Sequence, residues 1–389
     1  MTRLVSIDAL RGIAILLVMA SHLPFTWSSA PARIEEAATA LAPLVQAASG
    51  YGSFGVHLFL VVSGFCIHMR WARRGDLGSD VDFFAFWRRR LTRLYPPYFV
   101  TVLLSIAGLF VLFGLLGRQD AFPAAVGYSS ASQFFVDLGA HVAMIQNANG
   151  ASPRIANAAL WTLALEEQLY LMYFGLLALR RRLGWGRTMA IVLGVALAWR
   201  AMPLAIEGMP ATWNDLAPAR WPEWALGALA AERYVGLVRL PRVAMSWWTA
   251  VAFLVAAVAT NWPGSGGPAR VLLGDLLFGL AFFVAANAIV AREPSVGRRR
   301  GLTRVLASVG LFSYSLYLTH QPVMMAVKQV VLRLGLGEGP VELWLMLVLR
   351  GAAALFVGYV FYRIAELPAI RASRRIGRDM VAPLAAATT

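Results

Sequence analysis

Three residues near the amino terminus can bind a charged group or transfer a proton. Asp8, Arg11 and His22 lie in residues 7–27, a stretch that is otherwise apolar. Arg11 and His22 are eleven residues apart, which is three helical turns, so they share one face with His22 about 16 Å further along the axis. Ionisable groups in an apolar span usually mark a functional path, and imidazole can act as a general base near neutral pH. The simpler alternative is an Asp8–Arg11 pair at the membrane boundary and His22 in the headgroup region.

Two adjacent carboxylates, Glu166 and Glu167, form the next candidate group, and they lie in the first turns of an expected helix over residues 160–179. Adjacent positions on a helix diverge by about 100°, so only one of the two can face His22 directly. That carboxylate would orient the imidazole and stabilise its protonated form, as the third member of a catalytic triad does. A helix amino terminus also favours acidic residues, but this explains one carboxylate more easily than two.

Four arginines precede an aromatic segment between two apolar stretches. Arg88, Arg89, Arg90 and Arg93 are followed by Tyr95-Pro96-Pro97-Tyr98. Guanidinium groups bind phosphates in bidentate fashion and stack on aromatic rings, so this segment suits a nucleotide-like donor. Arginines are also enriched at any cytoplasmic membrane boundary. The sequence leaves both interpretations open.

Two other apolar stretches carry polar side chains that are candidates for supporting roles. They are His57 and Ser63 in residues 52–70, and Ser315, Tyr317 and His320 in residues 305–332. A histidine in such a helix either binds a ligand or is satisfied by its neighbours. Both readings stay open for His57, whereas the structural reading is the commoner one for a histidine such as His320.

The composition indicates what elements must position these residues. Of 389 residues, 59% are hydrophobic and only 14% are charged, whereas soluble domains carry roughly a quarter charged residues. We therefore expect an all-α, polytopic transmembrane bundle of about ten helices. The candidate spans are residues 7–27, 52–70, 94–117, 160–179, 188–206, 221–236, 246–262, 270–291, 305–332 and 341–364.

Charge placement predicts how the bundle is oriented. If both termini are cytoplasmic, most of the 35 Lys and Arg residues fall on cytoplasmic segments, as the positive-inside rule requires. The same rule explains the net charge of +15 without nucleic acid as a partner. We expect a multi-pass protein of the bacterial inner membrane, with one transmembrane domain over residues 1–370 and a basic, disordered cytoplasmic tail over residues 371–389.

Cysteine use excludes several kinds of chemistry. Cys66 is the only cysteine, so the chain forms no intramolecular disulfide and no zinc or iron–sulfur cysteine cluster. We expect no metal site and no permanently bound cofactor.

The combined pattern resembles the acyltransferase-3 family of membrane acyltransferases, which includes O-acetylases of polysaccharide, lipopolysaccharide and peptidoglycan and some macrolide acyltransferases. The resemblance covers nearly the whole chain. It rests on Leu10-Arg11-Gly12 with His22, Phe54-Gly55-Val56 with Phe59 and Ser63-Gly64-Phe65, Arg90 and Arg93 before Pro96, Trp161 with Glu166-Glu167 and Tyr170, Arg220 with Gly227, Ser313-Tyr314-Ser315 with Tyr317 and His320, and Glu366-Leu367-Pro368. Thr162 and Leu169 are mild departures, since many members carry Ser and Phe there.

The resemblance implies ten transmembrane helices, an acyl-CoA co-substrate, usually acetyl-CoA, bound from the cytoplasm, and an acceptor on the outer side. It implies that Arg11, His22, Arg90 and Arg93 matter most. No fused periplasmic hydrolase domain follows in this sequence, so transfer would be completed within the membrane part or with a separate periplasmic partner.

We therefore expect an O-acyltransferase acting on a carbohydrate-containing acceptor, in which His22 is either a general base or a covalent acyl carrier. A macrolide-type acceptor is one alternative. A proton-coupled transporter is another, because buried Arg, His and Glu also occur in carriers, although no internal repeat is evident.

Overall fold

The structure is a computed structural model of the chain. It describes residues 4–22, 50, 52, 54–74, 81–115, 128, 130–148, 157–262, 267–293, 301–334 and 340–379. All regular elements among these residues are helical, as expected. Five helical segments are long and apolar enough to cross a membrane, namely Val5–His22, Gly55–Ala72, Ala158–Ala205, Pro268–Val290 and Leu345–Ile376.

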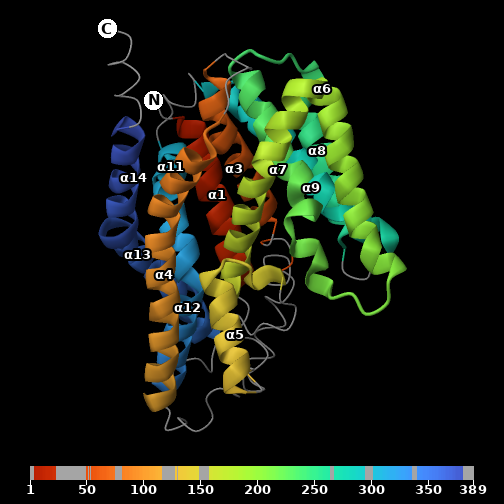
Figure 1. Cartoon of the computed structure of the whole chain (residues 1–389). Helices are drawn as coiled ribbons and strands as arrows, with labels where there is room; N and C mark the ends of the chain where they lie inside the picture. Colours follow the sequence, from red (N-terminus) through yellow and green to blue (C-terminus); the bar gives the residue numbers. More distant parts are fainter. Residues whose placement is uncertain are drawn as a thin grey trace.

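The described helices form one elongated bundle (Figure 1). In chain order they are α1 (Val5–His22), α3 (Gly55–Ala72), α4 (Phe83–Leu115), α5 (Ala131–Val142), α6 (Trp161–Ala205), α7 (Ala217–Tyr234), α8 (Trp247–Thr260), α9 (Pro268–Val290), α11 (Leu302–Leu311), α12 (Ser313–Arg333), α13 (Pro340–Phe361) and α14 (Leu367–Asp379). Short 3₁₀ turns η4 (Gln146–Ala148), η6 (Ala158–Leu160), η7 (Ala211–Asp215) and η8 (Arg242–Met245) join some of them, and a π-helix, η9 (Tyr362–Glu366), joins α13 to α14. The start of α1 and the end of α14 lie at one end of the bundle, and α5 lies toward the other.

Helix α4 begins at Phe83, well before the expected start at residue 94. The side chain of Asp82 caps this end, since its Oδ1 accepts a hydrogen bond of 3.0 Å from the backbone N–H of Ala85. Arginine and leucine are good helix formers, so nothing in the segment stops the helix earlier. The four arginines of residues 88–93 therefore project from a helix rather than from a loop.

The two helices expected over residues 160–179 and 188–206 are both present, as the two halves of α6, which meet at a kink at Gly184, where φ is 72°. Such a φ favours glycine, so the direction of the chain changes at this position. Two other expected boundaries differ. The expected span over 305–332 divides at Phe312 into α11 and α12. The tail boundary expected at residue 371 falls inside α14, and residues 380–389 lie outside the described part.

Helices α3 and α7 cross so closely that only glycine fits at the contact. A Cβ atom built on Gly64 would overlap the backbone carbonyl of Trp224, and one on Gly227 would overlap that of Val61. Membrane bundles use small residues in this way because apolar side chains gain little by leaving lipid, so close packing must hold the helices together. This crossing fixes the helix that carries Ser63 and Cys66.

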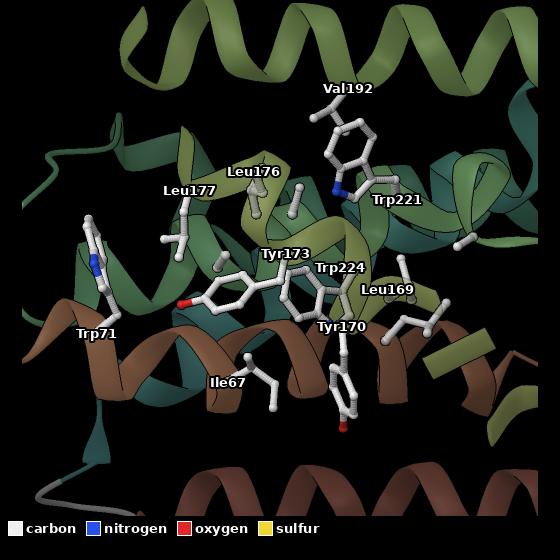
Figure 2. Close-up of a cluster of buried hydrophobic side chains, with 14 of the residues drawn as sticks. Ile67, Trp71, Leu169, Tyr170, Tyr173, Leu176, Leu177, Val192, Trp221 and Trp224 are labelled. Carbon is white, nitrogen blue, oxygen red and sulfur yellow. The ribbon is translucent and has the colours of Figure 1, made fainter. Parts of the chain in front are cut away.

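Beside this crossing, aromatic and aliphatic side chains from α3, α6 and α7 form a buried cluster (Figure 2). Trp224 is fully buried, and Tyr173 packs against it with ring centroids 5.4 Å apart. Tyr170 belongs to the same cluster, but Figure 2 shows its ring reaching past α3 with the hydroxyl directed away from the other members. The cluster therefore holds the ring of Tyr170, while its hydroxyl lies outside the cluster.

His57, whose role the sequence left open, is held by carboxylates. Its Nδ1 lies 3.3 Å from Oε1 of Glu223, and its Nε2 lies 3.3 Å from Oδ1 of Asp275. Arg200 and Arg220 reach the other oxygen of Asp275, at 2.9 Å and 2.6 Å. His57 therefore takes part in a charge network that joins α3, α6, α7 and α9, which favours the structural reading.

We predict that Gly64→Ala destabilises the protein by about 1–3 kcal/mol, because the added methyl group must push α7 away from α3. Gly175→Ala is the matched control, since a Cβ built on Gly175 meets nothing within 4 Å. Removing a glycine from an open helical site should leave stability unchanged or slightly higher. Thermal unfolding of both variants in detergent, followed by fluorescence-detected gel filtration, measures the difference. Equal melting temperatures would show that the crossing is looser than described.

Candidate active site

A cavity of about 180 Å³ lies in the middle of the bundle, between α1, α3, α4, α6, α11 and α12, with Glu366 of η9 at its edge. It brings together many of the residues singled out from the sequence. They are Arg11, Ser63, Arg90, Arg93, Glu166, Tyr170 and Tyr317. These residues come from five helices, so the site is assembled by the fold rather than by a local sequence motif.

One region of the cavity is cationic. Arg11 lies 3.7 Å from the Asp8 carboxylate, as the i,i+3 alternative expected, and also donates a hydrogen bond of 3.2 Å to Sγ of Cys66. The guanidinium of Arg90 lies 5.3 Å from the ring centroids of both Phe86 and Tyr170. Stacking of this kind holds a guanidinium in place while its edge stays available for an anion.

The structure distinguishes the two adjacent glutamates. Glu166 lines the cavity, and its Oε1 accepts hydrogen bonds from the Ser63 hydroxyl at 2.6 Å and the Tyr170 hydroxyl at 2.5 Å. Glu167 is buried elsewhere, and neither of its oxygens has a hydrogen-bond partner within the described part of the chain. Neither carboxylate contacts His22 among the described residues, so the triad-like contact expected from the sequence is not formed in this structure.

Glu366 is the second carboxylate at the cavity, and reasoning from residue types overlooked it as a site residue. Its Oε2 accepts hydrogen bonds from the Ser315 backbone N–H at 3.1 Å and from the Ser315 hydroxyl at 2.6 Å. Glu366 ends the π-helix η9, and such single wide turns are often found at functional sites. The only sequence signal was the Glu366-Leu367-Pro368 motif, since a π-turn has no simple periodicity.

The remaining arginines of the segment lie outside the cavity. Arg88 is exposed and Arg89 is half-buried on the first turns of α4. Partial burial and the positive charges of Arg70 and Arg90 lower the pKa of Arg89 to about 10, so it remains charged at neutral pH. Arg70, at the end of α3, therefore lies close to Arg89. The sequence could not reveal this proximity, because the two residues belong to different helices. Because these cations repel one another, an anion bound among them would be stabilised.

His22 and His320 form a pair outside the cavity lining, with ring centroids 5.0 Å apart. The Nδ1 of His22 lies 2.8 Å from the Val18 carbonyl, and that of His320 lies 2.8 Å from the Tyr317 carbonyl. Since a carbonyl only accepts, Nδ1 carries the proton in each ring and Nε2 keeps its lone pair. Nε2 of His320 is buried without a hydrogen-bond partner among the described residues.

Three further residues reach the cavity without having been singled out for chemistry, namely Cys66, Thr162 and Tyr314. Thr162 donates a hydrogen bond of 2.6 Å to the Tyr317 hydroxyl, and Tyr314 donates one of 2.8 Å to the Leu94 carbonyl. Trp161, by contrast, packs against the aromatic cluster of Figure 2 rather than lining the cavity.

Comparison with known proteins identifies the kind of bundle this is. Residues 4–363 match the family model Acyl_transf_3, described as an acyltransferase domain. The chain belongs to the acyltransferase-3 family. The family match covers the six α-helices that line the cavity, and Glu366 lies three residues beyond its end.

Named relatives of this acyltransferase-3 protein are similar over most of the chain at low identity. The peptidoglycan O-acetyltransferase OatA of Listeria monocytogenes is 23% identical over 392 residues, which cover 93% of this chain and 55% of the relative. The O-acetyltransferase OatA of Staphylococcus aureus is 24% identical over 386 residues, covering 93% and 56%. The chain spans about half the length of the curated relatives it matches. No solved structure matches it.

Proposed function

We propose that this acyltransferase-3 protein is a membrane O-acyltransferase. It moves an acyl group, acetyl in the first instance, from cytoplasmic acyl-CoA to a hydroxyl of a carbohydrate-containing acceptor on the outer side of the bacterial inner membrane. The observation that carries the proposal is the cavity itself. It has arginines at one end and, at the other, Tyr317, one helical turn before His320 on α12.

The size of the cavity indicates which part of the donor fits inside it. At about 180 Å³ it is smaller than the roughly 300–1,000 Å³ pockets that enclose drug-sized ligands. A whole nucleotide therefore stays outside, near Arg70 and Arg89 and the exposed Arg88 that precedes Arg89 on α4, and only the narrow arm with the thioester enters past Arg90 and Arg93. Bidentate guanidinium contacts suit the phosphates.

The proposed sidedness follows from the same arrangement. The ten-span count and the cytoplasmic termini stay proposals, supported by the arginine distribution and by the location of α1's start and α14's end at one end of the bundle (Figure 1). In this orientation the arginine cluster faces the cytoplasm, and His22, at the far end of α1, lies toward the outer side. The division into residues 1–370 and a basic tail is proposed likewise.

The proposed reaction transfers the acyl group from the sulfur of CoA to the oxygen of the acceptor hydroxyl. The acceptor hydroxyl attacks the thioester carbonyl while Nε2 of His22 takes its proton, the carbon–sulfur bond breaks, and the CoA thiolate leaves with a proton returned by the imidazolium. The Val18 carbonyl orients the ring in place of the expected glutamate. A covalent acyl–His22 intermediate uses the same lone pair and splits the transfer into two steps.

The names of the relatives bear on the acceptor. One is named as a peptidoglycan O-acetyltransferase, which favours a cell-envelope glycan over a macrolide-type acceptor. Completion of the transfer by a separate outer-side partner is part of the proposal. Family membership also argues against the transporter alternative.

We predict that His22→Ala lowers acyl transfer at least about 100-fold, the usual contribution of a general base, without changing the amount of folded protein. Membranes supplied with radiolabelled acetyl-CoA and assayed for label in envelope glycan measure the transfer. Gel filtration in detergent provides the control for folding. Transfer at the unmodified rate would exclude both proposed roles of His22.

We predict that Arg90→Gln with Arg93→Gln weakens acyl-CoA binding at least tenfold, because the entry to the cavity loses two cations. Cys66, the single cysteine, lies in the cavity wall and reports on occupancy through its alkylation rate. Acetyl-CoA should slow alkylation in the unmodified protein and in the control Arg242→Gln, but not in the double variant. Equal protection of Cys66 in all three proteins would show that Arg90 and Arg93 do not bind the donor and serve only to orient the chain in the membrane.

We predict that reporters fused after Gly236 and after Arg292 are cytoplasmic and that those fused after Gly208 and after Asn261 are on the outer side. Paired fluorescent-protein and alkaline-phosphatase fusions distinguish the two compartments, since each reporter is active on one side only. A fusion on the unexpected side would invert every later span and refute the ten-span arrangement.

A further inference from the structure

Tyr317 is fixed in place at one boundary of the cavity. Its side chain is 6% exposed, and its hydroxyl donates a hydrogen bond of 2.8 Å to the Ala159 carbonyl while accepting one of 2.6 Å from Thr162. The ring also packs edge-on against Phe59, with centroids 5.9 Å apart. Three contacts, from η6, α6 and α3, therefore hold this ring in one position.

The register of the helices shows which end of the cavity Tyr317 closes. Along α3 the lining runs from Ile67 to Val56, eleven residues, or about 16 Å. Arg90 lies seven residues after the start of α4, and the first turn of α12 lies beside Leu94 of α4, because the Tyr314 hydroxyl donates a hydrogen bond to the Leu94 carbonyl. Tyr317 lies one turn further along α12 than Ser313. The cavity thus has cations at one end, the proposed entrance of the donor, and an apolar end toward Tyr317.

That apolar end is formed by the residues farthest from the arginines. They are Val56, Phe59, Thr162, Leu163 and Tyr317. Beyond it lie the two imidazoles, since the His320 ring centroid is 5.6 Å from that of Tyr317 and 5.0 Å from that of His22. Of these three rings, Tyr317 is the one that lines the cavity. An acyl group that moves past this ring toward His22 has to turn it and break its two hydrogen bonds.

We propose that Tyr317 determines which acyl groups are transferred, by limiting the acyl chain to a short one such as acetyl. The proposal rests on the proposed function and names its donor class. With the nucleotide held at the arginines, the length of the arm is fixed, and the acyl group extends toward Tyr317. A short group brings its carbonyl carbon to the level of this ring, whereas a longer chain fills the apolar end and holds the carbonyl back near Ser63 and Glu166.

Thr162 serves as a positioning residue for Tyr317 in this account. The threonine hydroxyl donates to the phenol oxygen, and the phenol then donates to the Ala159 carbonyl, so one chain of hydrogen bonds fixes the ring. Losing the hydroxyl of either residue frees the ring to turn but keeps its bulk. Thr162→Val and Tyr317→Phe should therefore relax the length limit less than Tyr317→Ala does.

The test is a donor series with radiolabelled acetyl-, butyryl- and hexanoyl-CoA on membranes that contain the full-length protein and the envelope glycan as acceptor. Label transferred to the glycan reports turnover, and protection of Cys66 from alkylation reports binding. For Tyr317→Ala we expect the hexanoyl-to-acetyl turnover ratio to rise at least tenfold, with a smaller rise for Thr162→Val and Tyr317→Phe. The conservative variants keep the test valid if the alanine variant does not fold.

Ile67→Ala is the matched control, because Ile67 lines the entrance half of the same cavity. This substitution enlarges the cavity near the arginines and not near Tyr317, so it should not change the hexanoyl-to-acetyl turnover ratio. A ratio that stays constant in all Tyr317 and Thr162 variants while acetyl turnover persists, or one that rises equally in Ile67→Ala, overturns the role of Tyr317. Unmodified protein that neither binds nor turns over any of the three donors overturns the proposed function, and this inference with it.

Discussion

A charged side chain inside an apolar bundle must have a partner, and this constraint organises the molecule. At one place His57 lies between two carboxylates that two arginines also contact, and the four helices that contribute them are thereby tied together. At another, Glu232 accepts hydrogen bonds from Arg180 and from the indole of Trp185 and lies 3.0 Å from Nε2 of His68. Removing one member of such a buried set typically costs several kcal/mol, because the others are left without compensation. These networks hold the helices in register, and the close glycine crossings of α3 with α7 then set how near they come.

The cavity differs from these networks in where its charges are balanced. Inside it, Arg11, Arg90 and Arg93 meet the carboxylates Glu166 and Glu366, and Arg11 also lies 3.7 Å from the Asp8 carboxylate, so positive and negative groups are equal in number. The surplus of positive charge lies outside the cavity, at Arg70 on α3 and at Arg88 and Arg89 on the first turns of α4. A site that is balanced everywhere has no use for a charged ligand, whereas a site with surplus cations is stabilised when an anion arrives. This contrast separates the arginine cluster outside the cavity from the networks around His57 and Glu232 and is the physical reason for the proposed placement of the donor.

Reasoning from the sequence reached the helices and much of the cavity because both depend on features that sequence carries. Hydrophobic length identifies spanning segments, and an ionisable residue within one stands out against its neighbours. It missed the start of α4, because helix-forming arginines and leucines let a helix run past the point where hydrophobicity ends. It could not tell Glu166 from Glu167, since that choice depends on the rotation of α6 against α3. Glu366 became part of the site through a π-turn, and Cys66 through the approach of α1, neither of which has a local signature.

The position of Tyr317 suits a site that receives the donor from one side and the acceptor from the other. An acyl thioester is open to attack by water as well as by a sugar hydroxyl, so a site that faced both sides at once would waste its donor. In this structure the Tyr317 ring lies next to His320 and is held by two hydrogen bonds and by its packing on Phe59. The two hydrogen bonds are the part of this support that a bound arm can break at modest cost. In the proposed function, separation of the donor from the acceptor and selection of a short acyl group are then two consequences of the same side chain, and both depend on Thr162, a departure from the residue common in the family.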